Sequence, residues 1–170
     1  MKLQEHPKLI IPAGFLAGLL GGIIARAWMR WISTDPEFSW AGSLGIVFGF
    51  AIFGAIQATV HTVRRKPRRN WHIVLVRILG VIFSLQLFFA AGAVMFPTVL
   101  TTSLALWRER WKTWIRVLLA LSGFTFWVLI INSEIVSKFG WSLATIARIL
   151  LFGIIYSAII YALRPTVARR

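Results

Sequence analysis

Five blocks of apolar residues, separated by short polar segments, follow one another along this chain. They cover residues 9–25, 41–63, 73–106, 115–131 and 142–163. Four of the blocks have the length of one transmembrane helix, which needs about 20 apolar residues to cross a hydrocarbon core about 30 Å thick. The pattern therefore predicts an all-α, polytopic transmembrane helical bundle, with residues 1–170 forming a single integral membrane domain.

The third block is too long to be one transmembrane helix. At about 1.5 Å per residue, residues 73–106 would form a helix about 51 Å long. Gly92 and Pro97 lie near its middle, and each can end or restart a helix. We expect the block to fold back as a hairpin, which gives either six crossings or four full spans plus a re-entrant hairpin at 73–106. The expected spans are 9–26, 41–63, 72–89, 92–106, 115–132 and 142–163.

The charge pattern gives the expected orientation. The chain carries 19 Lys and Arg but only 5 Asp and Glu, a net charge of +14, and its mean hydropathy is +0.77. Such a charge suggests nucleic acid as a partner in a soluble protein, but here the basic residues lie between apolar blocks, as in cytoplasmic loops facing anionic lipid. With the hairpin, fourteen Lys and Arg fall on one side and three on the other. The positive-inside rule then predicts a bacterial cytoplasmic (inner) membrane protein with both termini in the cytoplasm and no nucleic acid partner.

Two basic segments are expected to contact anionic headgroups on the cytoplasmic side. Trp107, Trp111 and Trp114 are spaced as on one helical face, which predicts an amphipathic turn at the membrane surface. A docking site for an acidic protein is the alternative. Arg77, near the inner end of its span, is expected to reach the headgroups by snorkelling. The basic residues expected to contact lipid are Arg64, Arg65, Lys66, Arg68, Arg69, Arg108, Arg110, Lys112 and Arg116.

Small residues recur at helical spacing in the first two spans. Gly14, Gly18 and Gly22 are four residues apart. The second span repeats the theme with Gly42, Gly45, Gly49 and Gly54. Such faces let two helix backbones approach closely in a membrane. We expect the first two spans to pack on each other, and a contact between two copies of the chain is the alternative.

Charged residues also gather on the expected outer side. Arg26 and Arg30 are one helical turn apart, and Asp35 and Glu37 follow within reach of them. Arg148 lies inside the last span, where an arginine is costly unless it is paired, and Glu134 is its expected partner. These six residues predict an ion-pair cluster, and an outward-facing pocket for an anionic headgroup or solute is the alternative.

No residue pattern indicates catalysis or a cofactor. The chain contains no cysteine, and we expect no bound metal. His61 is the only histidine inside a span and is a weak candidate for a haem ligand, since a partner histidine at matching depth is lacking. Gln57 is expected to form a hydrogen bond between helices. We therefore expect a protein that is not an enzyme and holds no cofactor.

One segment carries a resemblance. The run from Arg26 to Trp40 follows the pattern R-x-W-M-R-x-I-S-x-D-P-E-F-x-W and precedes a glycine-rich span. It resembles small uncharacterised polytopic membrane proteins of actinobacteria, cyanobacteria and related bacteria. That family has no assigned activity, so the resemblance implies a membrane location and nothing further.

These patterns favour an accessory, assembly or structural subunit of a membrane complex, with the lipid bilayer and other membrane proteins as its partners. The alternative is a small transporter or channel for an anionic or amphiphilic solute, with an arginine-lined outer vestibule. The helix break between Gly92 and Pro97 motivates that alternative, because broken helices often line sites in transporters.

Overall fold

The described part of the chain is helical and contains no strand. The computed structural model describes residues 7–34, 39–65, 70–90 and 95–168. The elements are α1 (Pro7–Ile32), α2 (Trp40–Arg65), α3 (Asn70–Ala90), α4 (Phe96–Trp107), α5 (Thr113–Ile130), the π-helical turn η2 (Ile131–Val136), α6 (Ser137–Phe139), α7 (Leu143–Ala162) and α8 (Arg164–Val167). The predicted all-α bundle is confirmed.

Four of the described helical segments are long and apolar enough to cross a membrane. They are Leu9–Ile32, Trp40–Arg65, Thr113–Phe139 and Leu143–Val167. The first of them extends beyond the expected end at residue 26, so that Arg26 and Arg30 belong to the last turns of α1 rather than to a loop. This composition is that of a multi-pass membrane protein.

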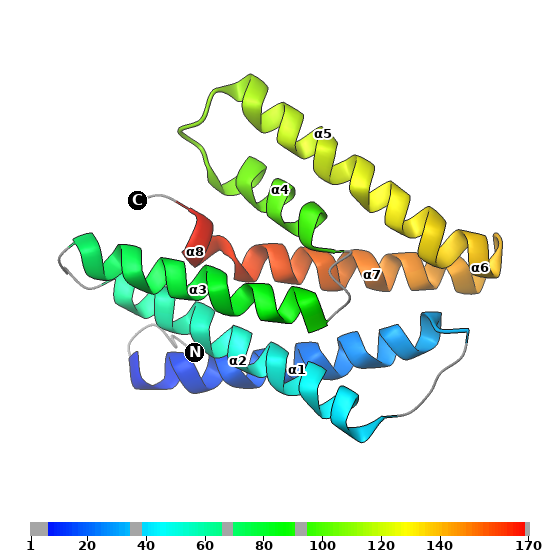
Figure 1. Cartoon of the computed structure of the whole chain (residues 1–170), viewed down its shortest axis with the longest axis horizontal. Helices are drawn as coiled ribbons and strands as arrows, with labels where there is room; N and C mark the ends of the chain where they lie inside the picture. The colour runs from blue at the N-terminus through cyan, green and yellow to red at the C-terminus, as the bar shows by residue number, and fades with distance from the viewer. Residues whose placement is uncertain (1–6, 35–38, 66–69, 91–94, 169–170) are drawn as a thin grey trace.

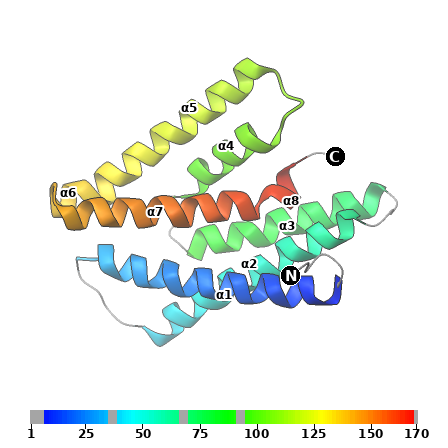
Figure 2. The same ribbon diagram turned by 180° about the vertical axis from the view of Figure 1, so that it is seen from behind.

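The helices form three groups that lie side by side (Figures 1 and 2). Helices α1, α2 and α3 lie on one side, the hairpin of α4 and α5 lies on the other, and α7 runs between them. We call the end of the bundle where α2 and α7 finish, near Arg65 and Arg164, the basic end. The end where α1 finishes and α7 begins, near Trp31 and Trp141, is the opposite end.

The α3–α4 hairpin turns back inside the bundle. Helix α4 has 12 residues, or about 18 Å at about 1.5 Å per residue, which is too short for a core of about 30 Å. Its first turn lies beside the middle of α7, because the Tyr156 hydroxyl donates to the carbonyl of Thr98 at 2.9 Å. Figure 1 shows α3 ending and α4 beginning there, away from both ends of the bundle. The short α4 favours the expected alternative of four full spans plus a re-entrant hairpin over six full crossings.

Helices α1 and α2 touch backbone to backbone. A Cβ atom added at Gly18 would lie under 3.0 Å from the carbonyl oxygen of Phe50, and one added at Gly54 would lie equally close to the carbonyl of Gly14. A Cβ at Gly22 would meet the Cα of Val47 at 2.8 Å. These glycines allow an approach that no larger residue permits.

The second-span glycines named from the sequence do not all share this contact. Among the described residues, nothing outside the nearby backbone of α2 lies within 4 Å of a Cβ built at Gly45, so Gly45 does not pack on α1. Gly49 is half-buried in α2. Gly54, also named from the sequence, is the α2 glycine that meets α1, since a Cβ added there would contact the backbone of Gly14 and Gly18.

The C-terminal segment, residues 164–168, is held by two arginines from other helices. Arg77 of α3 donates from Nε to the carbonyl of Thr166 at 2.7 Å, and from Nη2 to the carbonyls of Val167 at 3.0 Å and Ala168 at 3.1 Å. Arg64 of α2 donates to the carbonyl of Pro165. The expectation that Arg77 reaches the headgroups is wrong, because the carbonyls at the end of α8 attract its guanidinium.

A buried hydrogen-bond chain joins three helices beneath this segment. The Gln57 amide donates to Ser84 Oγ at 3.2 Å, and its carbonyl oxygen accepts from Thr166 Oγ1 at 2.6 Å. All three side chains are at most 4% exposed. The predicted interhelical role of Gln57 is confirmed, since it links α2 to α3 and α8.

The turn into α7 depends on one glycine and one serine. Gly140 has a φ of 61°, a conformation that side-chain-bearing residues rarely adopt, and it ends the helical segment that began at α5. Ser142 then caps α7, because its Oγ accepts from the amide of Thr145 at 3.1 Å. The turn places the start of α7 at the opposite end of the bundle.

Candidate functional site

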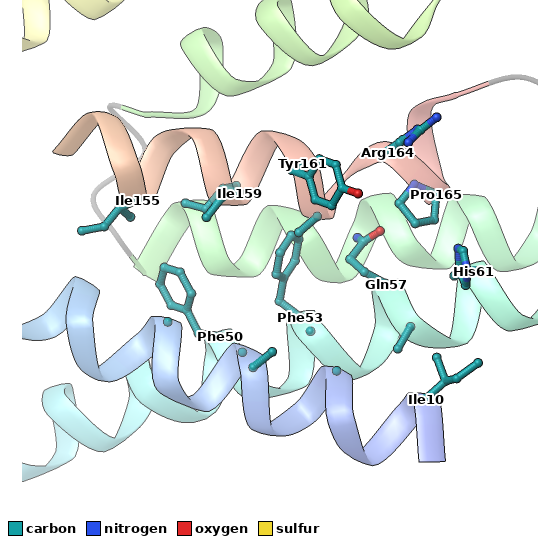
Figure 3. Close-up of a pocket in the computed structure, with 18 of the residues that line it drawn as sticks. Ile10, Phe50, Phe53, Gln57, His61, Ile155, Ile159, Tyr161, Arg164 and Pro165 are labelled. Carbon is teal, nitrogen blue, oxygen red and sulfur yellow. The ribbon is translucent and has the colours of Figure 1, made fainter. Parts of the chain in front are cut away.

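A groove of about 830 Å³ lies between α1 and α7, with α2 as its floor (Figure 3). At the opposite end the two walls are in contact, because Trp28 Nε1 donates to the carbonyl of Arg148 at 3.0 Å and the Trp28 ring stacks on Phe152 with centroids 4.9 Å apart. Toward the basic end the walls separate. The groove is therefore closed near the middle of the bundle and opens toward the basic end, and its volume falls within the roughly 300–1,000 Å³ typical of ligand sites.

The walls of the groove are apolar and contain several small residues. They include Ile10, Ala17, Gly21 and Ile24 of α1, and Ile154, Ile155, Ala158 and Ile159 of α7. The small residues widen the space between two helices that would otherwise be filled by side chains. An apolar groove at this depth accepts hydrocarbon, whether from lipid or from a protein side chain.

One face of α2 becomes steadily more polar along the floor. Phe50, Phe53, Gln57, His61 and Arg64 follow one another at helical spacing, and all five line the groove. Figure 3 shows Phe50, Phe53, Gln57 and His61 extending from α2 toward the space between the walls. The floor thus changes from aromatic at the closed end to cationic at the basic end.

The mouth of the groove is positively charged. Arg64, Arg65 and Arg164 all line it. Arg65 and Arg164 are exposed, and the Arg164 guanidinium lies 5.1 Å from the centre of the Trp107 ring. No Asp or Glu occurs among the described residues that line the groove. The mouth therefore offers an anion several cationic donors without a competing carboxylate in its lining.

Of the ion-pair cluster predicted for the opposite end, the structure describes Arg26, Arg30, Glu134 and Arg148. Arg26 donates from Nε to Ser43 Oγ at 2.9 Å, which joins the end of α1 to the start of α2. Arg30 lies exposed one turn further along α1. Asp35 and Glu37, the predicted acidic members, lie outside the described residues.

Arg148 is held by aromatic rings rather than by a carboxylate. Its guanidinium lies 4.0 Å from the ring centre of Phe139 and 5.2 Å from that of Trp31. Glu134 instead pairs with Lys138 one helical turn away, at 2.7 Å. The predicted Glu134–Arg148 pair is wrong, because a nearer lysine takes the acid. The ring faces attract the Arg148 cation, while its buried Nε has no hydrogen-bond partner among the described residues.

The segment after α4 does not form the predicted amphipathic helical turn. Helix α4 ends at Trp107 and α5 begins at Thr113, so the three tryptophans do not share a helical face. Trp107 is instead held within the bundle, since its Nε1 donates to the carbonyl of Ile160 at 3.1 Å. Arg116 donates from Nε to the carbonyl of Ala105 at 2.9 Å, near the end of α4.

The remaining basic residues expected to contact lipid fall into two groups. Arg108 lies over the Trp111 ring at 5.6 Å, while Arg110 and Lys112 are exposed at the basic end. Lys66, Arg68 and Arg69 lie outside the described residues. Their contact with headgroups stays a prediction.

His61 is half-buried in the groove and has no second histidine across from it among its described lining residues. His72 packs against Trp71 at the start of α3, with ring centres 3.9 Å apart. Within the described residues, no three His, Cys, Asp or Glu side chains come together as a metal site would require. The observations at His61 are those of a polar residue in the floor of the groove.

Comparison with protein-family models, curated proteins and solved structures finds no match. Function is therefore inferred from the residues of the chain itself. The groove is the feature that the sequence alone did not reveal. Its signal was present in α2, where Phe50, Phe53, Gln57, His61 and Arg64 share one face, but the opening also requires the divergence of α1 and α7.

Proposed function

We propose that this chain is a non-enzymatic membrane protein that acts as an accessory or assembly subunit of a larger membrane complex. The proposal rests on three buried or half-buried polar side chains, each of which forms hydrogen bonds between helices. Gln57, Tyr156 and Arg77 each bond to another helix or to its backbone. Polar groups used in this way stabilise a scaffold rather than act on a substrate.

The outer surface is consistent with such a role. Helix α5 packs against α4 and leaves a broad apolar face uncovered, on which Leu118, Leu121 and Phe124 are 56–62% exposed. In a membrane such a face meets lipid or the apolar helix of another protein, and both contacts are favourable. If the chain is a subunit, we expect an apolar helix of its partner to cover part of this α5 face.

The test is purification from native membranes in a mild detergent, followed by mass spectrometry of the proteins that remain bound. We expect a partner in a fixed ratio to the chain. Replacing Leu121 and Phe124 of α5 with arginine should release it, while the same pair of changes at Leu75 and Ile78, exposed on α3, serves as the control. Recovery of the chain as a monomer without any bound protein would contradict the proposal.

We also propose that the basic end faces the cytoplasm of a bacterial inner membrane. The natural lack of cysteine makes this directly measurable, because single cysteines can be introduced without a background signal. At the opposite end, Lys138→Cys should react with a membrane-impermeant maleimide in intact spheroplasts. At the basic end, Lys112→Cys should react only after the membrane is opened. The reverse pattern would contradict the positive-inside argument.

A small transporter for an anionic or amphiphilic solute is the second candidate, favoured by the break between α3 and α4 near the middle of α7. Of the arginines expected to line its outer vestibule, Arg26 bonds to Ser43 and Arg148 lies against aromatic rings, which leaves the vestibule a prediction. Flux of an amphiphilic anion through proteoliposomes, abolished by filling the groove, would favour transport over the subunit role.

A further inference from the structure

We infer that the groove between α1 and α7 binds one anionic phospholipid, with its phosphate at the arginines of the mouth and its acyl chains along the apolar walls. The inference stands apart from the proposed subunit role, since a lipid site is compatible with any assembly. It rests on three observations: the depth of the groove, its polarity gradient and the charge at its mouth.

The depth of the groove fits one leaflet of a bilayer. From Phe50 to Arg64 the floor rises about 21 Å at about 1.5 Å per residue. A hydrocarbon core of about 30 Å gives each leaflet about half that depth, to which the headgroup region is added. The groove therefore reaches from the headgroups to near the middle of the membrane.

The same geometry disfavours a transmembrane helix as the occupant. A spanning helix needs a groove that is open through the whole core, whereas this one is closed where Trp28 meets Phe152. Both closing side chains are at most 5% exposed, so the closure is a packed contact. A molecule whose apolar part ends near the middle of the membrane fits the space, and phospholipid acyl chains have that property.

Polarity along the floor follows the polarity of a phospholipid. Phe50 and Phe53 lie at the deep end beside the isoleucines of α7, where acyl chains would end. Gln57 donates one amide N–H to Ser84 and accepts from Thr166 at its carbonyl oxygen, which lowers the cost of placing this side chain beside hydrocarbon. His61 follows at the depth expected for the glycerol and ester groups of the lipid.

The mouth selects for negative charge. Arg65 lines it from the end of α2 and Arg164 from the start of α8, where the Arg164 guanidinium now lies over the Trp107 ring. In the proposed complex Arg164 leaves that ring and donates, with Arg65, to the phosphate. No carboxylate among the described lining residues competes with that phosphate. A zwitterionic lipid brings its own cation to this position, where it meets the arginines unfavourably.

The test uses the purified, delipidated full chain in a neutral detergent, titrated with phosphatidylglycerol or with phosphatidylcholine of the same acyl chains. Native mass spectrometry measures the lipid bound to each protein. We expect phosphatidylglycerol to bind at least about tenfold more tightly, and R65Q/R164Q to remove that preference, because charged hydrogen bonds are each worth about tenfold. The matched control is R110Q/K112Q, which removes the same charge at the basic end outside the groove and should keep the preference.

A second pair of variants tests the walls. Ala158→Trp places an indole in the groove from an exposed position of α7. It should lower the affinity for both lipids by at least about tenfold, because the indole occupies the space of the acyl chains. Ala120→Trp makes the same change at an exposed position of α5 outside the groove and should leave binding intact. Thermal melts of all variants confirm that each is folded.

Three results would overturn the inference. In the first, the wild-type chain binds the two lipids equally. In the second, Ala158→Trp binds lipid as well as Ala120→Trp does, which places the lipid elsewhere. In the third, R65Q/R164Q and R110Q/K112Q lose affinity to the same extent, which reduces the effect to general attraction by a basic surface.

Discussion

Replacing Gly18 with alanine is expected to destabilise the bundle by at least about 3 kcal/mol, at the upper end of the cost of overpacking. The new Cβ would lie under 3.0 Å from the carbonyl oxygen of Phe50 and 3.0 Å from the Cα of Ala51, so backbone and not a flexible side chain stands in its way. Helices α1 and α2 would have to move apart along their length. Titration with a denaturing detergent, followed by circular dichroism, measures the change in the free energy of unfolding.

Gly45→Ala provides the control for this prediction. It is the same substitution inside α2, at a position where an added Cβ meets nothing within 4 Å. Stability there should stay the same or rise by up to about 1 kcal/mol, from the better helix propensity of alanine. If both variants lose the same free energy of unfolding, close packing of α1 on α2 is not the cause. A change of oligomer mass at Gly18 without a change in monomer stability would instead assign this face to a contact between copies.

Replacing Arg77 with methionine is expected to lower the free energy of unfolding by about 2–4 kcal/mol, since the carbonyls of Thr166, Val167 and Ala168 lose charged donors. Methionine keeps much of the apolar stem and removes only the guanidinium. We expect residues 164–168 to detach first, which limited proteolysis of the C-terminal segment should show as earlier cleavage than in the native chain.

Two further substitutions make the Arg77 prediction specific. Arg77→Lys should restore part of the stability, because an ammonium keeps the charge but lacks the planar fork that reaches several carbonyls at once. Arg110→Met removes an arginine from an exposed position at the basic end and should change stability by less than about 0.5 kcal/mol. If both methionine variants behave alike, the hydrogen bonds of Arg77 are not what holds the segment.

Much of the fold could be predicted because a membrane-spanning helix requires an apolar block of a characteristic length, which is visible in the sequence. The four long apolar blocks became the four long helical segments. Two of these segments run furthest beyond their expected ends: α1 continues to Ile32 and the segment that begins with α5 continues to Phe139. The long block at 73–106 was predicted to break, but its depth could not be decided from composition. That depth follows from a tertiary contact between Thr98 and Tyr156, 58 residues apart in the chain.

The polar contacts were harder to predict, because they depend on competition among partners. Counting charges makes Glu134 the natural partner of Arg148, yet Lys138 lies one helical turn away and takes the acid. Aromatic faces, which carry no formal charge, then hold the arginine. Arg77 and Arg116 were likewise expected to meet lipid, and both are engaged by backbone carbonyls near helix ends.

The groove could not be predicted from any single helix. Its floor is a readable stripe on α2, but its walls belong to α1 and α7, which are more than a hundred residues apart in the chain. Two helices of the same composition that lay in contact along their whole length would leave no space. The angle between them is set by the packing of Trp28 on Phe152 at one end and by the C-terminal segment at the other.

The backbone contact between α1 and α2 determines how the groove can change its width. Since Gly14, Gly18 and Gly54 let the two helices interlock, one wall and the floor behave as a single rigid body. Widening must then come from a rotation of α7 alone about the Trp28–Phe152 contact. Pro165 lies near the moving end, and the bond that its carbonyl accepts from Arg64 of α2 must open before the groove can widen.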